Sequence, residues 1–156
     1  FGSCTVQEEV GLRGAITSSY TIAPDININL EVGVAGDYPG MNLNLAQEKL
    51  GSGPSIFLHD SSMIPNLKLR DFCINTAKKL NIPIQFSVIS GYGEDGAAAQ
   101  KSFGGIPAIN IGIPTRYLHS HNGIIDLNDF IKAKKLVKNL VENLDATTVK
   151  SIKSFD

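Results

Sequence analysis

The sequence predicts an α/β layered domain, because segments with strand-like patterns alternate along the chain with segments of helical periodicity. A length of 156 residues suits one domain with a sizeable core. A content of 42% hydrophobic and 19% charged residues is that of an ordinary globular protein rather than a disordered one. One α/β domain without internal repeats is therefore the starting expectation.

The first expected elements lie in residues 1–40. Residues 1–6 resemble the middle of a strand, and residues 11–18 predict a short helix of small residues. Residues 26–34 alternate apolar and polar side chains with a period of two, which is typical of a strand with one buried face. Residues 36–40, Gly-Asp-Tyr-Pro-Gly, predict a turn.

The next elements form a strand followed by a helix. Residues 51–54, Gly-Ser-Gly-Pro, indicate a second flexible stop before a short apolar strand at 55–59. Residues 66–80 predict a helix with one apolar face. The residues of this face are Leu69, Phe72, Cys73, Thr76, Ala77 and Leu80.

Two strands and a long helix complete the expected fold. The strands are residues 84–89 and 108–113, and a segment rich in Gly and Ala around 91–99 separates them. Residues 126–144 give the strongest helical pattern, which Asp126 can cap. The expected apolar stripe of this helix consists of Leu127, Phe130, Ile131, Ala133, Val137, Leu140, Val141 and Leu144. The tail to Asp156 is polar and weakly patterned.

Composition narrows the possible partners and compartment. A net charge of −1 gives no sign of binding to nucleic acid or to an acidic membrane surface. No apolar run is long enough to span a bilayer, and no signal peptide is recognisable. Cys4 and Cys73 are too few for a disulfide framework, so we expect buried thiols in a protein of the cytoplasm. Because the chain begins with Phe1 and not Met, we expect a piece of a longer protein whose upstream strand is missing.

The most informative motif is the adjacent pair Glu8 and Glu9, where the expected first strand gives way to a helix. Ligands of open α/β sheets gather at the carboxyl ends of strands. Adjacent residues on a strand point to opposite faces, so the pair can cooperate only where the backbone turns. One glutamate could then bind a metal ion while its neighbour transfers a proton. The alternative is a solvated acidic pair at a helix N-terminus.

Other potential metal ligands lie at expected strand ends and in loops, namely Glu31, Asp37, His59, Asp60, Asp95, His119 and His121. Glu31 places a charge beside apolar Leu30 and Val32, although the polar face of an edge strand would also explain it. His119 and His121 would diverge on a strand, so at most one of them is expected to face a given site. A set of one His and two Glu suits zinc, cobalt or manganese better than calcium.

Five segments together resemble a family of cytoplasmic cocatalytic metallo-aminopeptidases, which includes glutamyl and leucyl aminopeptidases and the tetrahedral, TET-type enzymes. These segments keep the order and spacing of the family over nearly all of residues 4–144. They are Thr-Val-Gln-Glu-Glu-Val-Gly-Leu-Arg-Gly-Ala at 5–15, Glu-Val-Gly-Val-Ala-Gly-Asp-Tyr-Pro-Gly at 31–40, Leu-Gly-Ser-Gly-Pro at 50–54, Gly-Tyr-Gly-Glu-Asp-Gly-Ala at 91–97 and Ile-Pro-Thr-Arg-Tyr-Leu-His-Ser at 113–120. The first and last are the specific ones. The resemblance implies a zinc-peptidase-like, three-layer α/β/α fold with a mixed, mostly parallel sheet.

The resemblance also implies roles for individual residues. Glu8 would be the general base for a water that bridges two divalent ions, with zinc or cobalt favoured and manganese possible. Glu9 and His119 would bind one ion, and Glu31 would bind the other at a position where many relatives carry Asp. The longer Glu arm must then fold back or bind from one side. Glu94-Asp95 stands where many relatives have Thr-Asp and is assigned no role, and His59 and His121 are expected to be structural or exposed.

By the same resemblance, residues 1–156 would be the C-terminal part of the catalytic domain, without the upstream half and the inserted dimerisation domain. A bridging Asp and a further His would come from the upstream half, so this piece alone should bind metal weakly and be inactive. The parent would act on peptides with a free N-terminus and form homo-oligomers, from dimers up to a dodecamer. Two alternatives stay open: a glycoside hydrolase of the endoglucanase kind that uses Glu8 and Glu9, and a catalytically inert assembly or binding fragment.

Overall fold

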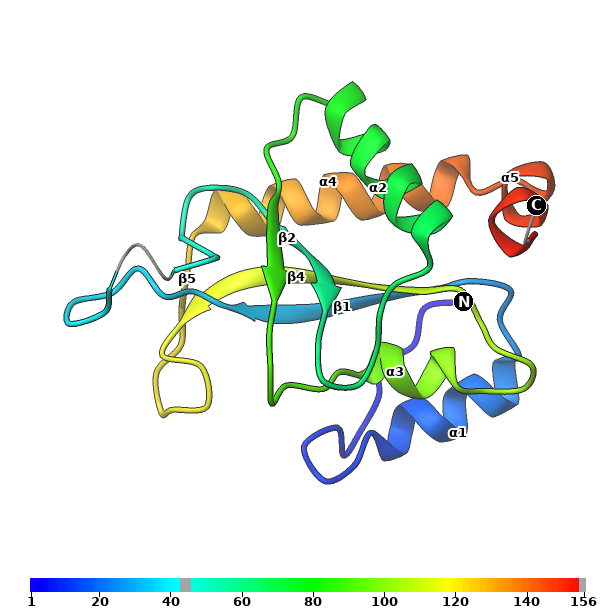
Figure 1. The fold of residues 1–156 in the computed structure, drawn as a ribbon, viewed down its shortest axis with the longest axis horizontal. Helices are drawn as coiled ribbons and strands as arrows, with labels where there is room; N and C mark the ends of the chain where they lie inside the picture. The colour runs from blue at the N-terminus through cyan, green and yellow to red at the C-terminus, as the bar shows by residue number, and fades with distance from the viewer. Residues whose placement is uncertain (43–45, 155–156) are drawn as a thin grey trace.

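The computed structural model of the protein describes residues 1–42 and 46–154 (Figure 1). Its elements, in chain order, are α1 (Arg13–Ile22), β1 (Asn27–Val34), β2 (Ser55–His59), α2 (Leu67–Lys79), β3 (Gln85–Val88), α3 (Asp95–Gln100), β4 (Ala108–Arg116), β5 (Ile124–Ile125), α4 (Leu127–Asn143) and α5 (Ala146–Lys153). The strands expected at 26–34, 55–59, 84–89 and 108–113 are confirmed, the last being three residues longer than expected.

The strands form one mixed sheet in the order β1-β4-β2-β3, with β5 also paired to β4. β4 is parallel to β1 and antiparallel to β2 and β5, and β2 is parallel to β3. The register places Asn29 opposite Asn110 and Glu31 opposite Gly112. The β1–β4 ladder therefore joins the strand that carries Glu31 to the strand that leads into the His119 loop.

Helices cover both faces of the sheet, which confirms the expected three-layer α/β/α arrangement (Figure 1). α2, α4 and α5 pack on one face, and α3 packs on β1 and β4 from the other face with α1 against it. The main core lies under α2 and α4 and consists of Ile56, Leu69, Cys73, Ala77, Ile82, Ile109, Ile111, Leu136, Leu140 and Ile152. A smaller cluster of Met63, Ala97 and Ala108, with Leu12 against it, lies under α3.

The two long helices begin at N-cap side chains, of which the sequence analysis named Asp126 but not Asn66. Asn66 accepts a hydrogen bond from the backbone N–H of Leu69 at 2.9 Å, and Asp126 accepts one from Asn128 at 2.7 Å. Such side chains replace partners that the first turn of a helix lacks. The expected stripe of α4 is partly wrong, because Leu127, Phe130, Ile131 and Val141 are exposed. The helix buries Leu136 instead, which lies in register with Ala133 and Leu140.

Two helices and one short strand were not anticipated. α3 lies in the segment rich in Gly and Ala, where residues 94–99 are all buried, so no alternation of polar and apolar residues marks the helix. α5 lies in the tail, where Asp145 caps it and Ile152 is its one buried residue; residues 155–156 of that tail lie outside the described part. β5 has two residues, too few for a recognisable period.

The N-terminal segment differs most from expectation. Residues 1–6 are exposed and form no strand, because none of the strands in the described part pairs with them. The first helix runs from Arg13 to Ile22 rather than over 11–18. Of the two cysteines, Cys73 is buried but Cys4 is exposed, so the expectation of two buried thiols is wrong for Cys4.

Within residues 1–42 and 46–154, we find no helix with the length and hydropathy needed to cross a lipid bilayer.

Candidate functional site

The Glu8–Glu9 pair lies on a tight turn before α1, not at the end of a strand. Gln7 adopts a φ of 61°, in the left-handed region, and reverses the chain. The backbone N–H groups of Gly11 and Leu12 donate to the Glu8 carbonyl at 3.0 and 2.9 Å and close the turn. A turn frees the two adjacent side chains from the opposite directions that a strand would impose on them. The pair can therefore serve one site.

Glu9 meets His119 from the other end of the chain. The Oε1 atom of Glu9 lies 3.1 Å from Nε2 of His119, and both side chains are largely exposed. His119 follows β4 in a turn in which Tyr117 and His119 both have positive φ, and Ser120 donates to the Tyr117 carbonyl at 2.6 Å. His121 and His59 are exposed, as expected.

Glu31 faces the same side of the sheet as Asn29, two residues back along β1. Its Oε1 atom accepts a hydrogen bond from Asn29 Nδ2 at 3.3 Å. The long side chain therefore folds back along its own strand, one of the two postures expected for Glu at a position where Asp would be shorter. A second neighbour is Glu94, at the N-cap of α3, whose carboxyl group lies close enough to Glu31 for that residue to raise its pKa.

The electrostatics of Glu8 connect these pieces into one site. Partial burial raises the pKa of the Glu8 carboxyl above its ordinary value. Three carboxylates raise this pKa further and one imidazole lowers it, namely Glu31, Glu9, Asp95 and His119. Each of these contributions requires that the side chain lies near enough to Glu8 to act on its charge. The four residues expected to form the site, Glu8, Glu9, Glu31 and His119, thus lie in one region.

Two buried glutamates join this region although no role was expected for either. Glu94 is 2% exposed, and burial followed by the contact with Glu31 raises the pKa of its carboxyl far above the usual range. Glu48 is fully buried beside Gly33, and burial also raises its pKa. The only sequence signal for Glu94 was its place at a position where many relatives have Thr. Glu48 lies in a loop and gave no signal.

The remaining acidic candidates have structural partners. Asp60 follows β2 and accepts hydrogen bonds from the backbone N–H groups of Ser62 and Met63 at 2.6 and 2.8 Å. Asp95 accepts a hydrogen bond from Thr5 and ties the N-terminal segment to α3. Neither is exposed, so neither presents a free carboxylate to solvent.

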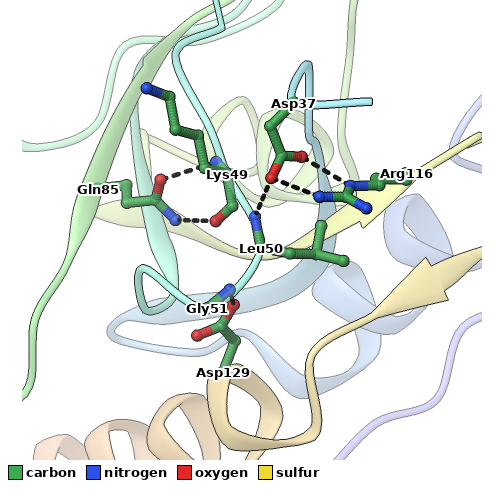
Figure 2. Close-up of polar contacts among 7 residues, drawn as sticks. All are labelled: Asp37, Lys49, Leu50, Gly51, Gln85, Arg116 and Asp129. Carbon is green, nitrogen blue, oxygen red and sulfur yellow. Dashed lines mark hydrogen bonds and ion pairs between the residues drawn. The ribbon is translucent and has the colours of Figure 1, made fainter. Parts of the chain in front are cut away.

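Asp37 belongs to a clamp that holds the loop between β1 and β2 (Figure 2). The Arg116 guanidinium donates to both of its carboxylate oxygens, at 2.9 and 2.8 Å, and the Leu50 N–H donates to Asp37 at 3.1 Å. Two further contacts hold the same loop. Gly51 N–H donates to Asp129 of α4 at 2.7 Å, and the Gln85 side-chain amide pairs with the backbone of Lys49. Asp37 thus holds Arg116, the last residue of β4, three residues before His119. Its carboxylate is already paired, so it is not a free metal ligand.

The donor atoms suit a divalent cation of the zinc type. Two ligands on one tetrahedral ion, each bonded at about 2.1 Å, lie roughly 3.4 Å apart. The 3.1 Å between Glu9 and His119 is close to this spacing, so the two side chains fit a shared ion with a small adjustment. In the part of the chain that the structure describes, no three His, Cys, Asp or Glu side chains form a complete metal site.

The geometry therefore joins a proton acceptor to ligands for a cation. Glu9 and His119 provide a mixed carboxylate and imidazole pair, and Glu31 provides a second carboxylate with a backing hydrogen bond. Glu8, with a raised pKa, stands beside them. This combination suits metal-assisted hydrolysis, in which a positioned carboxylate removes a proton from the attacking water.

Comparisons with known proteins agree with this chemistry. The family model described as M42 glutamyl aminopeptidase matches residues 1–136. The glutamyl aminopeptidase of Lactococcus lactis subsp. cremoris (strain MG1363) is 32% identical over 96% of this chain and 41% of its own length. The chain spans about two fifths of the length of the curated relatives it matches.

Solved structures give the same result. The TET aminopeptidase from the marine sediment archaeon Thaumarchaeota archaeon SCGC AB-539-E09 is 45% identical with a TM-score of 0.92, over 96% of this chain and 42% of that one. The TET1 peptidase of Pyrococcus horikoshii, which can assemble into a tetrahedron or a large octahedral shell, is 32% identical with a TM-score of 0.70. That match covers 87% of this chain and 38% of the TET1 chain.

Proposed function

Because the chain belongs to the M42 glutamyl aminopeptidase family, we propose that the whole protein is a metal-dependent aminopeptidase. It removes residues one at a time from peptides with a free N-terminus. The single observation that carries this proposal is the approach of Glu9 and His119 to 3.1 Å beside Glu8, which draws distant parts of the chain into one site.

The proposed roles follow from the donor atoms. Glu9 and His119 hold one ion and Glu31 holds the other. When bound, two divalent ions polarise the scissile carbonyl and lower the pKa of the attacking water. Glu8 accepts the proton of that water and returns it to the leaving amine. Its raised pKa brings it nearer to neutral pH, where a general base works best.

The test uses the protein in its full natural length, an aminoacyl-p-nitroanilide and its N-acetylated counterpart. We expect hydrolysis of the free substrate only, loss of activity after dialysis against a chelator, and recovery with Zn²⁺ or Co²⁺. Glu8→Gln should lower kcat by about 10²–10⁴-fold, the usual share of a general base, with unchanged metal content. His119→Ala should lose metal as well as activity.

The matched control is Glu142→Gln, which removes an exposed carboxylate of α4 that contacts Lys138. It should retain full activity and metal content. Activity that survives the chelator, or full metal content and activity in His119→Ala, would contradict the proposal.

A glycoside hydrolase is the weaker alternative. Glycosidases place two carboxyl groups on either side of the scissile bond, about 5 Å apart or more. Glu8 and Glu9 are adjacent, and Glu9 turns toward His119, which leaves no opposed pair between them. Release of reducing sugar from a cellulose-type substrate in the presence of chelator would favour this alternative. An inert binding module would hold no metal in the whole protein.

Three further properties are part of the proposal. The metal is zinc or cobalt, with manganese as a third choice, because carboxylate and imidazole ligands accept all three. The whole protein forms a homo-oligomer, as the Pyrococcus horikoshii TET1 peptidase does. Its location is the cytoplasm. Metal analysis, light scattering and cell fractionation test these points separately.

A further inference from the structure

A hydrogen-bonded chain of side chains connects the buried Asp60 to Glu31. Asn110 Nδ2 donates to Asp60 Oδ2 at 3.0 Å, and Asn29 Nδ2 donates to Asn110 Oδ1 at 3.1 Å. Asn29 Nδ2 also donates to Glu31 Oε1 at 3.3 Å. Asp60 and Asn110 are 1% and 0% exposed, so water does not compete for the contact between them, whereas the two contacts of Asn29 are partly buried.

Only one orientation of the two asparagine amides satisfies all of these hydrogen bonds. The other oxygen of Asp60 is occupied by the N–H groups of Ser62 and Met63, which keeps the whole carboxylate an acceptor. Asn110 must therefore turn its NH₂ group toward Asp60 and its oxygen toward Asn29. Asn29 in turn must present its NH₂ group, and both of its N–H bonds are used, one toward Asn110 and one toward Glu31.

The surrounding fold is built to hold this chain in place. Asn29 and Asn110 are directly opposite each other in the parallel ladder of β1 and β4. Gly96 of α3 packs over Asn110, and a Cβ at this position would overlap the Asn110 side-chain oxygen and lie 3.2 Å from its Cγ. The absence of a side chain at 96 therefore lets the helix cover the chain without displacing it.

We propose that Asp60, Asn110 and Asn29 are positioning residues that fix the orientation in which the Glu31 carboxylate binds its cation. The proposal rests on the role of Glu31 in the proposed function. Groups that hydrogen-bond to a ligand orient it, and their loss typically costs about 10–100-fold in metal affinity or activity. Glu31 needs such support more than Asp would, because its longer side chain has an additional rotatable bond.

The first test compares two asparagines on the same face of β1. Asn29→Ala removes the hydrogen-bond donor to Glu31. The control, Asn27→Ala, removes the side-chain amide two residues earlier on β1. The buried oxygen of Asn27 has no hydrogen-bond partner among the residues that the structure describes. Both variants are made in the full-length protein, and Co²⁺ affinity is measured by competition with a chromophoric chelator. We expect about 10–100-fold weaker binding of one Co²⁺ and an altered visible spectrum for Asn29→Ala, and neither change for Asn27→Ala.

The second test reverses the direction of the hydrogen bonds without substituting Asn29 or Glu31. Asp60→Asn preserves the size of the side chain but presents an NH₂ group to Asn110. Asn110 must then rotate its amide, so that its own NH₂ group faces Asn29. Asn29 must then turn its oxygen forward and withdraw its donor from Glu31. Adding Asn110→Asp restores an acceptor opposite Asn29, so the double variant should recover the affinity that Asp60→Asn loses. A structural role alone predicts that the double variant is no better than the single one.

The outcomes separate the two proposals. If the unsubstituted protein binds no Co²⁺, the proposed function fails and this inference fails with it. If the unsubstituted protein binds Co²⁺ and Asn29→Ala, Asp60→Asn and the double variant all bind it equally well, the positioning role alone is wrong. A loss in Asp60→Asn that the double variant does not recover would also overturn it.

Discussion

Gly33 offers a test of how β1 packs beside the candidate site. It follows Glu31 on the same face of β1, directly against the carboxyl group of Glu48. A Cβ at position 33 would lie 2.6 Å from Glu48 Cδ and closer still to Oε2. Glu48 is fully buried and accepts a hydrogen bond from the Ser87 hydroxyl, so any movement of its side chain disturbs a buried contact. Gly33→Ala must therefore displace a packed side chain.

The cost follows from two contributions. Inserting a methyl group into a filled interior costs about 1–3 kcal/mol. Moving Glu48 also breaks its hydrogen bond with Ser87, and a buried polar group without a partner costs a further 1–3 kcal/mol or so. We expect Gly33→Ala to lower the free energy of unfolding by about 2–6 kcal/mol in total.

Urea unfolding followed by circular dichroism measures this change, with a double-mutant cycle as the decisive comparison. In a Glu48→Ala background the obstacle is gone, and Gly33→Ala should cost less than about 1 kcal/mol. Gly104→Ala is the matched control, because a Cβ there meets nothing within 4 Å, and it should be nearly neutral. If Gly33→Ala costs the same in both backgrounds, the collision with Glu48 is not the cause and the reasoning is wrong.

Three further predictions concern the clamp, the metal ligands and the cysteines. Asp37→Asn should lower stability by about 1–2 kcal/mol at pH 7. Because the Arg116 guanidinium holds the pKa of Asp37 in the folded protein below its ordinary value, the difference from the unsubstituted protein in urea titrations should begin to shrink as the pH falls below about 4. It should disappear only when the pH lies below that lowered pKa. The 156-residue chain alone has fewer than the three protein ligands that are usual at each catalytic ion, because Glu9 and His119 serve one ion and Glu31 the other. Calorimetry should therefore show weak Zn²⁺ binding, and a p-nitroanilide assay should show no turnover. Tight binding with turnover would refute the ligand assignment. Cys4 should react with a thiol reagent in the folded protein while Cys73, whose burial raises its pKa to about 12, reacts only after unfolding, and equal rates would contradict the packing of α2.

Local patterns in the sequence determined most of the secondary structure. The alternation in residues 26–34 and the apolar face of residues 66–80 identify β1 and α2, and the cap Asp126 marks where α4 begins. These signals work because strand period, helix period and capping depend on residues a few positions apart. Where that local contrast is missing, as in the fully buried Ala-rich α3, the pattern gives no signal.

The candidate base Glu8 and the candidate ligands Glu9, Glu31 and His119 were also named from the sequence, and their roles came from a resemblance of motifs and not from their spacing. Only the tertiary structure decided that Glu9 meets His119, that Glu31 folds back on Asn29, and that Asn110 and Asp60 stand behind it. These contacts join residues that are far apart in the chain, and they depend on the order and register of β1 and β4. Strand order and register follow from the packing of the whole domain, which no short window of sequence contains.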